Sequence, residues 1–180
     1  MGTPEELIKT ADYLKNEFEM KDLGKTKFCL DLQIEHLPNR ILVHQSTYIG
    51  KVLKHFHMDK AHPLSTPMVV RLLDVKKDTF RPQEDGEKTL GPEVPYLSAI
   101  GSLMYLAYCT RPNIAFSVNL LVRYSSASTR RYWNGVKYVL CYLCGTTNMR
   151  LFYPNNSNPQ LVVYVDASYL FDPHKVRSQI

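Results

Sequence analysis

Carboxylates at spacings that would support divalent-metal chemistry are scarce in this sequence. Phosphodiester chemistry with two metal ions needs a cluster of acids, because one carboxylate cannot hold two cations about 4 Å apart. The chain contains no adjacent Asp-Asp pair. Asp12, Asp22 and Asp31 each stand alone, and surface solvation explains all three. Asp166 differs because it ends the apolar run 161–165, where a metal ligand is a better explanation than a chance acid.

Sulfur and imidazole groups also give little support for a metal site. Cys141 and Cys144 have the Cys-x-x-Cys spacing, but no second cysteine pair or histidine pair accompanies them. We therefore predict core or surface thiols rather than a zinc site. His55 and His57 are two positions apart and cannot share one face of a helix, which favours ordinary surface or packing roles.

Six basic side chains are the best candidates for contact with a phosphate backbone: Lys51, Lys54, Lys60, Arg130, Arg131 and Lys137. They fall on or beside two expected helices, and a basic helix face can place several cations along successive phosphates. A solvated helix face explains them equally well. The net charge of +5 and the pI near 9.0 fit both explanations. Tyr48 and Trp133 could stack on bases, but their positions in apolar stripes favour core packing.

The composition predicts a soluble globular protein. Of the 180 residues, 44% are hydrophobic and 22% are charged, which lies within the range of globular domains. The first residues carry no basic start followed by an apolar run, and no stretch approaches the roughly 18 apolar residues of a membrane span. The four cysteines lie in apolar or periodic stretches, which favours a reducing compartment. We expect an intracellular, unsecreted chain without membrane contact.

The first third of the sequence predicts a helix, a β-hairpin and a second helix. Thr3, a proline and Glu6 can form a capping box, and apolar residues then recur at helical spacing until a stop at 22–24. Residues 28–35 alternate between apolar and polar, 37–40 form an expected turn, and the alternation resumes at 41–45. Ser46 can cap the second helix, which carries an apolar stripe and a basic exposed face.

The rest of the sequence predicts a long loop followed by helices and short strands. Prolines and mixed charges between 63 and 95 indicate a loop or linker. Apolar spacing predicts helices near 96–108, 114–124 and 129–145, and short strands at 151–153 and 161–165. The predicted fold class is therefore α+β.

Several phrases of the sequence together resemble the Pol polyprotein of copia-type retrotransposons, and they occur in the order of that family. They are FEMKDLG at 18–24, QSTYI at 45–49, STPM at 65–68, IGSLMYL at 100–106, TRP at 110–112, WNGVK at 133–137, YLCGT at 142–146 and YVDA at 164–167. Any one of these phrases could arise by chance, but their shared order across nearly the whole chain makes the resemblance specific.

The resemblance implies a division of the chain into four segments. Residues 1–62 would be the end of a reverse-transcriptase palm and a thumb-like part, 63–95 a linker, 96–150 a helical connection, and 151–180 the start of an RNase H-like domain. Asp166 would match the first RNase H carboxylate. For the complete parent enzyme, the resemblance implies Mg²⁺ as the cofactor and a template–primer duplex as the partner.

The chain also departs from the family pattern. Asn113 stands where the family commonly has Asp, and Tyr132 stands where it usually has His, although neither position is catalytic in the family. The polymerase Asp-Asp motif of the family would lie upstream of Met1, and the chain ends at Ile180, before the remaining RNase H carboxylates. We therefore expect no polymerisation or cleavage by this chain alone, and at most weak nucleic-acid binding.

Two alternatives to this expectation remain. The chain could be an adopted interaction module that binds a protein or self-associates through exposed sheet edges and apolar faces. It could also be a piece of a longer, active reverse transcriptase.

Overall fold

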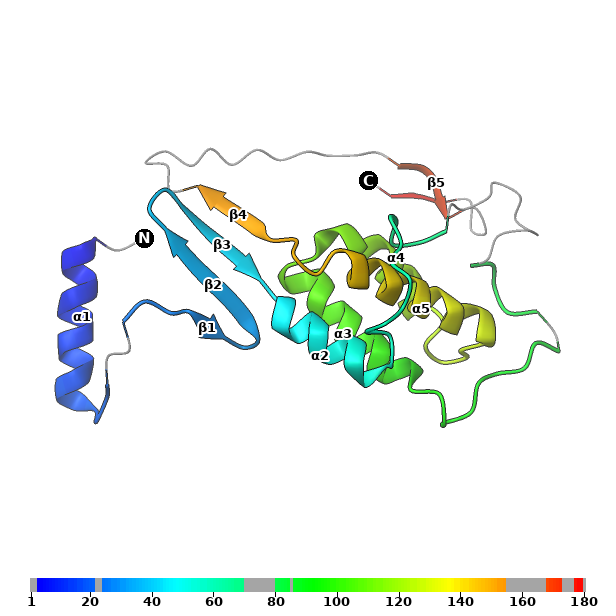
Figure 1. The fold of residues 1–180 in the computed structure, drawn as a ribbon, viewed down its shortest axis with the longest axis horizontal. Coiled ribbons are helices and arrows are strands. Elements are labelled where there is room, and N and C mark those ends of the chain that lie inside the picture. The colour runs from blue at the N-terminus through cyan, green and yellow to red at the C-terminus, as the bar shows by residue number, and fades with distance from the viewer. Residues whose placement is uncertain are drawn as a thin grey trace.

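The computed structural model describes residues 3–21, 24–69, 80–84, 86–154, 168–172 and 177–179. The elements in chain order are α1 (Pro4–Glu17), β1 (Phe28–Cys29), β2 (Leu32–Leu37), β3 (Arg40–His44), α2 (Ser46–His55), α3 (Tyr96–Cys109), a 3₁₀ turn (Pro112–Ile114), α4 (Ala115–Val122), α5 (Arg130–Gly145), β4 (Leu151–Pro154), β5 (Ser168–Asp172) and β6 (Arg177–Gln179). Figure 1 shows a bundle of helices next to a small antiparallel sheet. The predicted α+β class is confirmed.

The helices α2, α3, α4 and α5 share one apolar core. Ile49, Val52 and Leu53 of α2 belong to the same buried cluster as Leu103 of α3 and Leu140 of α5. Helix α3 carries no charged residue, so most of its surface is available for burial among its neighbours. Residues 46–55 and 96–145 therefore form one packed unit across the segment that separates them in sequence. The division of the chain into four segments stays a prediction.

Part of the expected loop is fastened to this core. Phe80 is 3% exposed and packs against Gly135, where an added Cβ atom would lie 3.1 Å from the Phe80 ring and 2.9 Å from a Leu121 methyl group. Further along, Leu90 N donates to the carbonyl of Ser128 at 2.8 Å. The glycine at 135 is thus explained by the close approach of an aromatic ring to α5.

The hairpin prediction is confirmed, but its first strand is shorter than expected. The alternation of 28–35 predicted one continuous strand, whereas Leu30 and Asp31 have φ angles of 48° and 57° and separate β1 from β2. Left-handed backbone cannot continue a strand, so the chain turns there and β1 folds back on β2. Asp31 tolerates this conformation better than most residues, but the alternation concealed the turn.

The strand predicted at 151–153 forms, and it completes the sheet of the hairpin. The sheet has the order β1-β2-β3-β4 and is antiparallel throughout, with Val43 opposite Leu151 and Arg40 opposite Pro154. The strand predicted at 161–165 lies outside the described residues. The palm, thumb and RNase H-like assignments stay predictions.

The helices of the described part are short or charged. None of them is long and apolar enough to cross a membrane.

The shared core predicts a contrast between two leucines of α3. Leu103 is fully buried, whereas Leu97 is 66% exposed on the same helix. We expect Leu103→Ala to lower the free energy of unfolding by about 2–5 kcal/mol, because it leaves a cavity among packed side chains. Leu97→Ala serves as the matched control and should change it by less than about 0.5 kcal/mol. Urea unfolding followed by circular dichroism measures both, and equal effects would contradict the described core.

Candidate nucleic-acid interface

The start of α2 is held by polar contacts to three other parts of the fold. Gln45, which precedes the helix and is 1% exposed, accepts a hydrogen bond from Thr110 Oγ1 at 2.8 Å. Ser46 Oγ donates to the carbonyl of Thr147 at 3.0 Å, and Thr47 N donates to Gln33 Oε1 at 2.9 Å. These contacts fix α2 to the end of α3, to the turn after α5 and to β2. The basic side chains that α2 carries are therefore on a positioned helix.

A buried arginine joins the ends of α3 and α5. Arg111 is 1% exposed and donates to the carbonyl of Thr146 at 2.6 Å and to the Thr146 hydroxyl, with its guanidinium 6.0 Å from the Tyr142 ring centroid. Burial lowers the pKa of Arg111, because the charged form loses solvation. Asn113 Nδ2 donates to the Tyr142 hydroxyl at 2.6 Å, so this departure from the family pattern has a structural partner.

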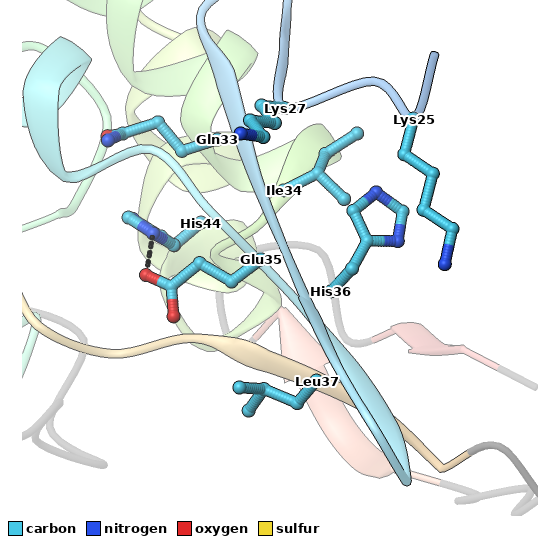
Figure 2. Close-up of a pocket in the computed structure, with 8 residues that line it drawn as sticks. All are labelled: Lys25, Lys27, Gln33, Ile34, Glu35, His36, Leu37 and His44. Carbon is cyan, nitrogen blue, oxygen red and sulfur yellow. Dashed lines mark hydrogen bonds and ion pairs between the residues drawn. The ribbon is translucent and has the colours of Figure 1, made fainter.

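A second polar network ties the sheet to the chain that follows α5. His44, which is buried, has Nε2 3.1 Å from Glu35 Oε1, and Arg150 Nη1 lies 2.6 Å from Glu35 Oε2. Figure 2 shows Glu35 and His44 on one side of the hairpin, joined to each other, while Ile34 and His36 point to the opposite side. No sequence signal predicts these contacts, because Glu35 and Arg150 are 115 positions apart.

The six basic candidates fall into different environments. Lys54, Lys60 and Arg130 are exposed and make no ion pair with a described residue. Lys51 pairs with Asp31, with Nζ 2.9 Å from Oδ1. Lys137 is half-buried, and its Nζ lies 5.9 Å from the centroid of the Trp133 ring.

Arg131 has the most extensive contacts of the six. Its guanidinium binds Glu87 through two contacts of 2.7 Å and 3.1 Å, and it donates to the carbonyl of Arg81 at 3.0 Å. The side chains of Arg131 and Glu87 are only 15% and 26% exposed. The hydrogen bond from Arg131 lowers the pKa of the Glu87 carboxyl. Arg131 thus clamps Arg81 and Glu87 to α5, a role that the basic pattern alone did not indicate.

Helices α2 and α5, which carry five of the six basic candidates, pack against each other. The rings of Phe56, at the end of α2, and Trp133, on α5, lie 6.5 Å apart with their planes at 72°. Trp133 is 8% exposed, and Tyr48 is partly buried against the core and meets the Tyr105 ring edge-on at 5.2 Å. The prediction that Tyr48 and Trp133 are packing residues is confirmed.

Metal ligands are not gathered in the described part of the chain. Within it, no group of three or more His, Cys, Asp or Glu side chains is placed to hold a metal ion. Cys141 and Cys144 are free thiols, and Cys144 Sγ lies 3.6 Å from the carbonyl oxygen of Ala61. Burial raises the pKa of the Cys141 thiol. Asp166 lies outside the described residues, so its predicted role as an RNase H ligand stays a prediction.

Comparison with known proteins identifies the class of this chain. Residues 4–70 match the family model described as reverse transcriptase (RNA-dependent DNA polymerase). The retrovirus-related Pol polyprotein from transposon TNT 1-94 of Nicotiana tabacum is 39% identical over 92% of this chain. Those from transposons RE2 and RE1 of Arabidopsis thaliana are each 31% identical, over 95% and 94% of this chain. No solved structure matches the chain.

The chain belongs to the family of copia-type retrotransposon Pol polyproteins, as its sequence phrases predicted. It spans 12% of the length of the Nicotiana tabacum polyprotein and 11% of each of the two from Arabidopsis thaliana. It corresponds to a segment of such a polyprotein.

The neighbouring arginines at the start of α5 provide a matched test of these environments. We expect Arg131→Ala to lower the free energy of unfolding by about 1–3 kcal/mol, because it leaves the half-buried Glu87 without its charged partner. Arg130→Ala removes the same charge from an exposed position and should cost less than about 0.5 kcal/mol. Urea unfolding at pH 7 compares the two variants.

The same contact sets the pH dependence of the difference in the free energy of unfolding between wild type and Arg131→Ala. Because the folded-state pKa of Glu87 is lowered, its contribution to stability is present above the unfolded pKa and is lost as the pH falls through the folded pKa. This difference in the free energy of unfolding should therefore have its full size at pH 7 and should become smaller as Glu87 becomes protonated. A difference that stays constant into acid would show that the ion pair is not its cause.

Proposed function

We propose that this chain contacts the backbone of a template–primer duplex within a copia-type reverse transcriptase, and that it neither polymerises nor cleaves nucleic acid by itself. The observation that supports the binding role is the set of exposed cations Lys54, Lys60 and Arg130, which make no ion pair with a described residue. Unpaired cations can neutralise phosphates and release condensed counterions without first breaking an internal ion pair.

The anchoring of these cations supports the proposal further. Lys54 is on α2, whose start is fixed by Gln45 and Ser46, and Arg130 opens α5, which packs against α2 through Trp133. The backbone that carries Lys54 and Arg130 is already ordered, so only side-chain freedom is lost when these two cations meet a phosphate backbone. The contacts are to phosphates, and the binding we propose is independent of base sequence.

The acidic side chains support the absence of independent catalysis. Two-metal phosphoryl transfer needs several converging carboxylates, and the described residues contain no such group. Asp12 is exposed on α1, and Asp31 is engaged by Lys51. We propose that the Mg²⁺ ions of the complete enzyme are held by acids elsewhere in the polyprotein. An intracellular location is part of the same proposal.

A triple substitution tests the binding role. Lys54→Ala, Lys60→Ala and Arg130→Ala together should weaken binding of a DNA–RNA hybrid by at least about tenfold at low salt, and should reduce the slope of log affinity against log salt by roughly 2–3. Filter binding across a salt series measures both quantities. The wild-type chain should bind in a salt-dependent manner whatever the sequence of the hybrid.

The control removes the same charge elsewhere. Lys9→Ala, Lys21→Ala and Lys88→Ala also take three cations from exposed positions of the described chain, so the net charge of the two triple variants is equal. If binding depends only on net charge, both variants will lose the same affinity and the proposed interface is wrong. Wild-type binding that is absent at low salt, or insensitive to salt, also contradicts the proposal.

An activity assay tests the catalytic half of the proposal. The purified chain supplied with Mg²⁺, a primed template and nucleotides should incorporate none of them, and it should leave an RNA–DNA hybrid intact. If the hybrid is degraded, Asp166→Asn identifies the source. Loss of degradation in that variant would assign RNase H activity to the chain and overturn the proposal.

Self-association, the alternative drawn from the sequence, stays a prediction. The edge strands of the four-stranded sheet are β1 and β4, and Phe152 and Tyr153 of β4 are 55% and 52% exposed. An exposed strand edge can pair with a second chain. Light scattering that finds a stable monomer at high protein concentration would contradict it.

A further inference from the structure

Helix α1 exposes an apolar stripe that has no cover in the structure. Leu7 is 65% exposed, and with Ala11 and Leu14 it recurs at the spacing that places side chains on one helix face. Phe18, which follows the helix in an extended conformation, is 60% exposed. Figure 1 shows α1 standing apart from the helical bundle, on the side of the molecule where β1 and β2 lie. A helix of 14 residues is marginal in water without packing, even with a capping box.

One face of the four-stranded sheet is also apolar and only partly buried. The register places the following side chains on that face: Cys29, Leu32, Ile34, His36, Ile41, Val43, Leu151 and Tyr153. None of them is buried, and Tyr153 is 52% exposed. Figure 2 shows Ile34 and His36 pointing to this side, away from Glu35 and His44. A small antiparallel sheet normally buries its apolar face against another element.

We propose that α1 docks by its apolar stripe, formed by Leu7, Ala11 and Leu14, on this apolar face of the sheet of its own chain. The dimensions agree, because a helix of 14 residues is about 21 Å long and a strand of six residues is about 20 Å long. The connection 18–27 spans up to about 33 Å when extended, which is enough for α1 to reach the face from the start of β1.

Charge complementarity favours α1 over other occupants of the face. At 100° per residue, Glu6 and Glu17 lie together along one border of the apolar stripe. The border of the sheet face carries Lys25 and Lys27, which line a hollow of about 520 Å³ with Ile34 and His36. Glu17 directly precedes the connection and Lys25 lies near its other end, so docking brings these opposite charges close together.

Docking would cover the thiol of Cys29, which can therefore serve as a chemical probe of docking. Cys29 is an exposed free thiol on the proposed docking face, whereas Cys109 lies on α3 in the helical bundle. The alkylation rate of Cys29 therefore reports the covered fraction of the face, and that of Cys109 reports the integrity of the bundle. Peptide mapping by mass spectrometry gives both rates from one sample of the full chain.

The test compares two adjacent substitutions on α1. Leu14→Asp places a charge in the stripe, while Tyr13→Asp places the same charge on a different face, at a residue that is 63% exposed. We expect iodoacetamide to modify Cys29 about tenfold more slowly in the wild type and in Tyr13→Asp than in Leu14→Asp. The rate at Cys109 should be the same in all three chains.

The alkylation rates distinguish α1 from any other segment or chain that could cover the apolar face of the sheet. Equal Cys29 rates in the three chains, whether fast or slow, would overturn the proposal, because α1 would then not be what covers the face. The protection should also be independent of protein concentration, since the helix and the face belong to one chain. Protection that grows with concentration would assign the cover to α1 of a second copy and would overturn docking within the chain. Nucleic-acid binding does not enter this test.

Discussion

The guanidinium of Arg111 is enclosed within the protein, and the arrangement of the helix ends follows from its need for partners. A buried cation is strongly unfavourable unless hydrogen bonds and polarisable groups replace its lost water. Thr146 supplies a carbonyl and a hydroxyl, and the face of Tyr142 lies beside the charge. These groups come from the end of α5, so α5 must end where α3 ends. The nearby bond from Thr110 to Gln45 adds the start of α2 to the same junction.

The sheet and the basic helices both depend on this junction. Strand β3 runs directly into Gln45, and the turn after Thr146 leads through Arg150 to β4, so the junction delivers the two strands next to each other. The contacts of Glu35 with His44 and Arg150 then hold them in register. Because α2 begins and α5 ends at the same junction, the cations on them keep a fixed relation to one another. That fixed relation supports the phosphate-contacting surface proposed above.

Periodicity and the capping box of α1 predicted the local elements well, but the prediction that Ser46 caps α2 is wrong, because the cap position is Gln45 and no side chain caps the helix. Long-range polar pairs could not be predicted from the sequence. Thr3 and Glu6 predicted the start of α1, and apolar spacing predicted α3 and α5, because these signals are contained within a few residues. The turn at Leu30 and Asp31 was hidden by an alternation that continues through it. Among the basic candidates, the sequence shows that Arg131 is charged, but it does not show the ion pair with Glu87. That ion pair joins residues 44 positions apart and depends on the tertiary fold.

The pairing of β3 with β4 has a consequence for the order in which the chain assembles. Arg40 and Pro154 are partners although more than a hundred residues separate them, so β3 leaves the ribosome long before the strand that completes its sheet. Contacts within and between α3, α4 and α5 are closer in sequence, and they form with a smaller entropic cost of loop closure. During synthesis, the edge of β3 that pairs with β4 therefore has no partner until β4 has been made. The helical bundle forms first, and β4 then adds to the sheet beside it.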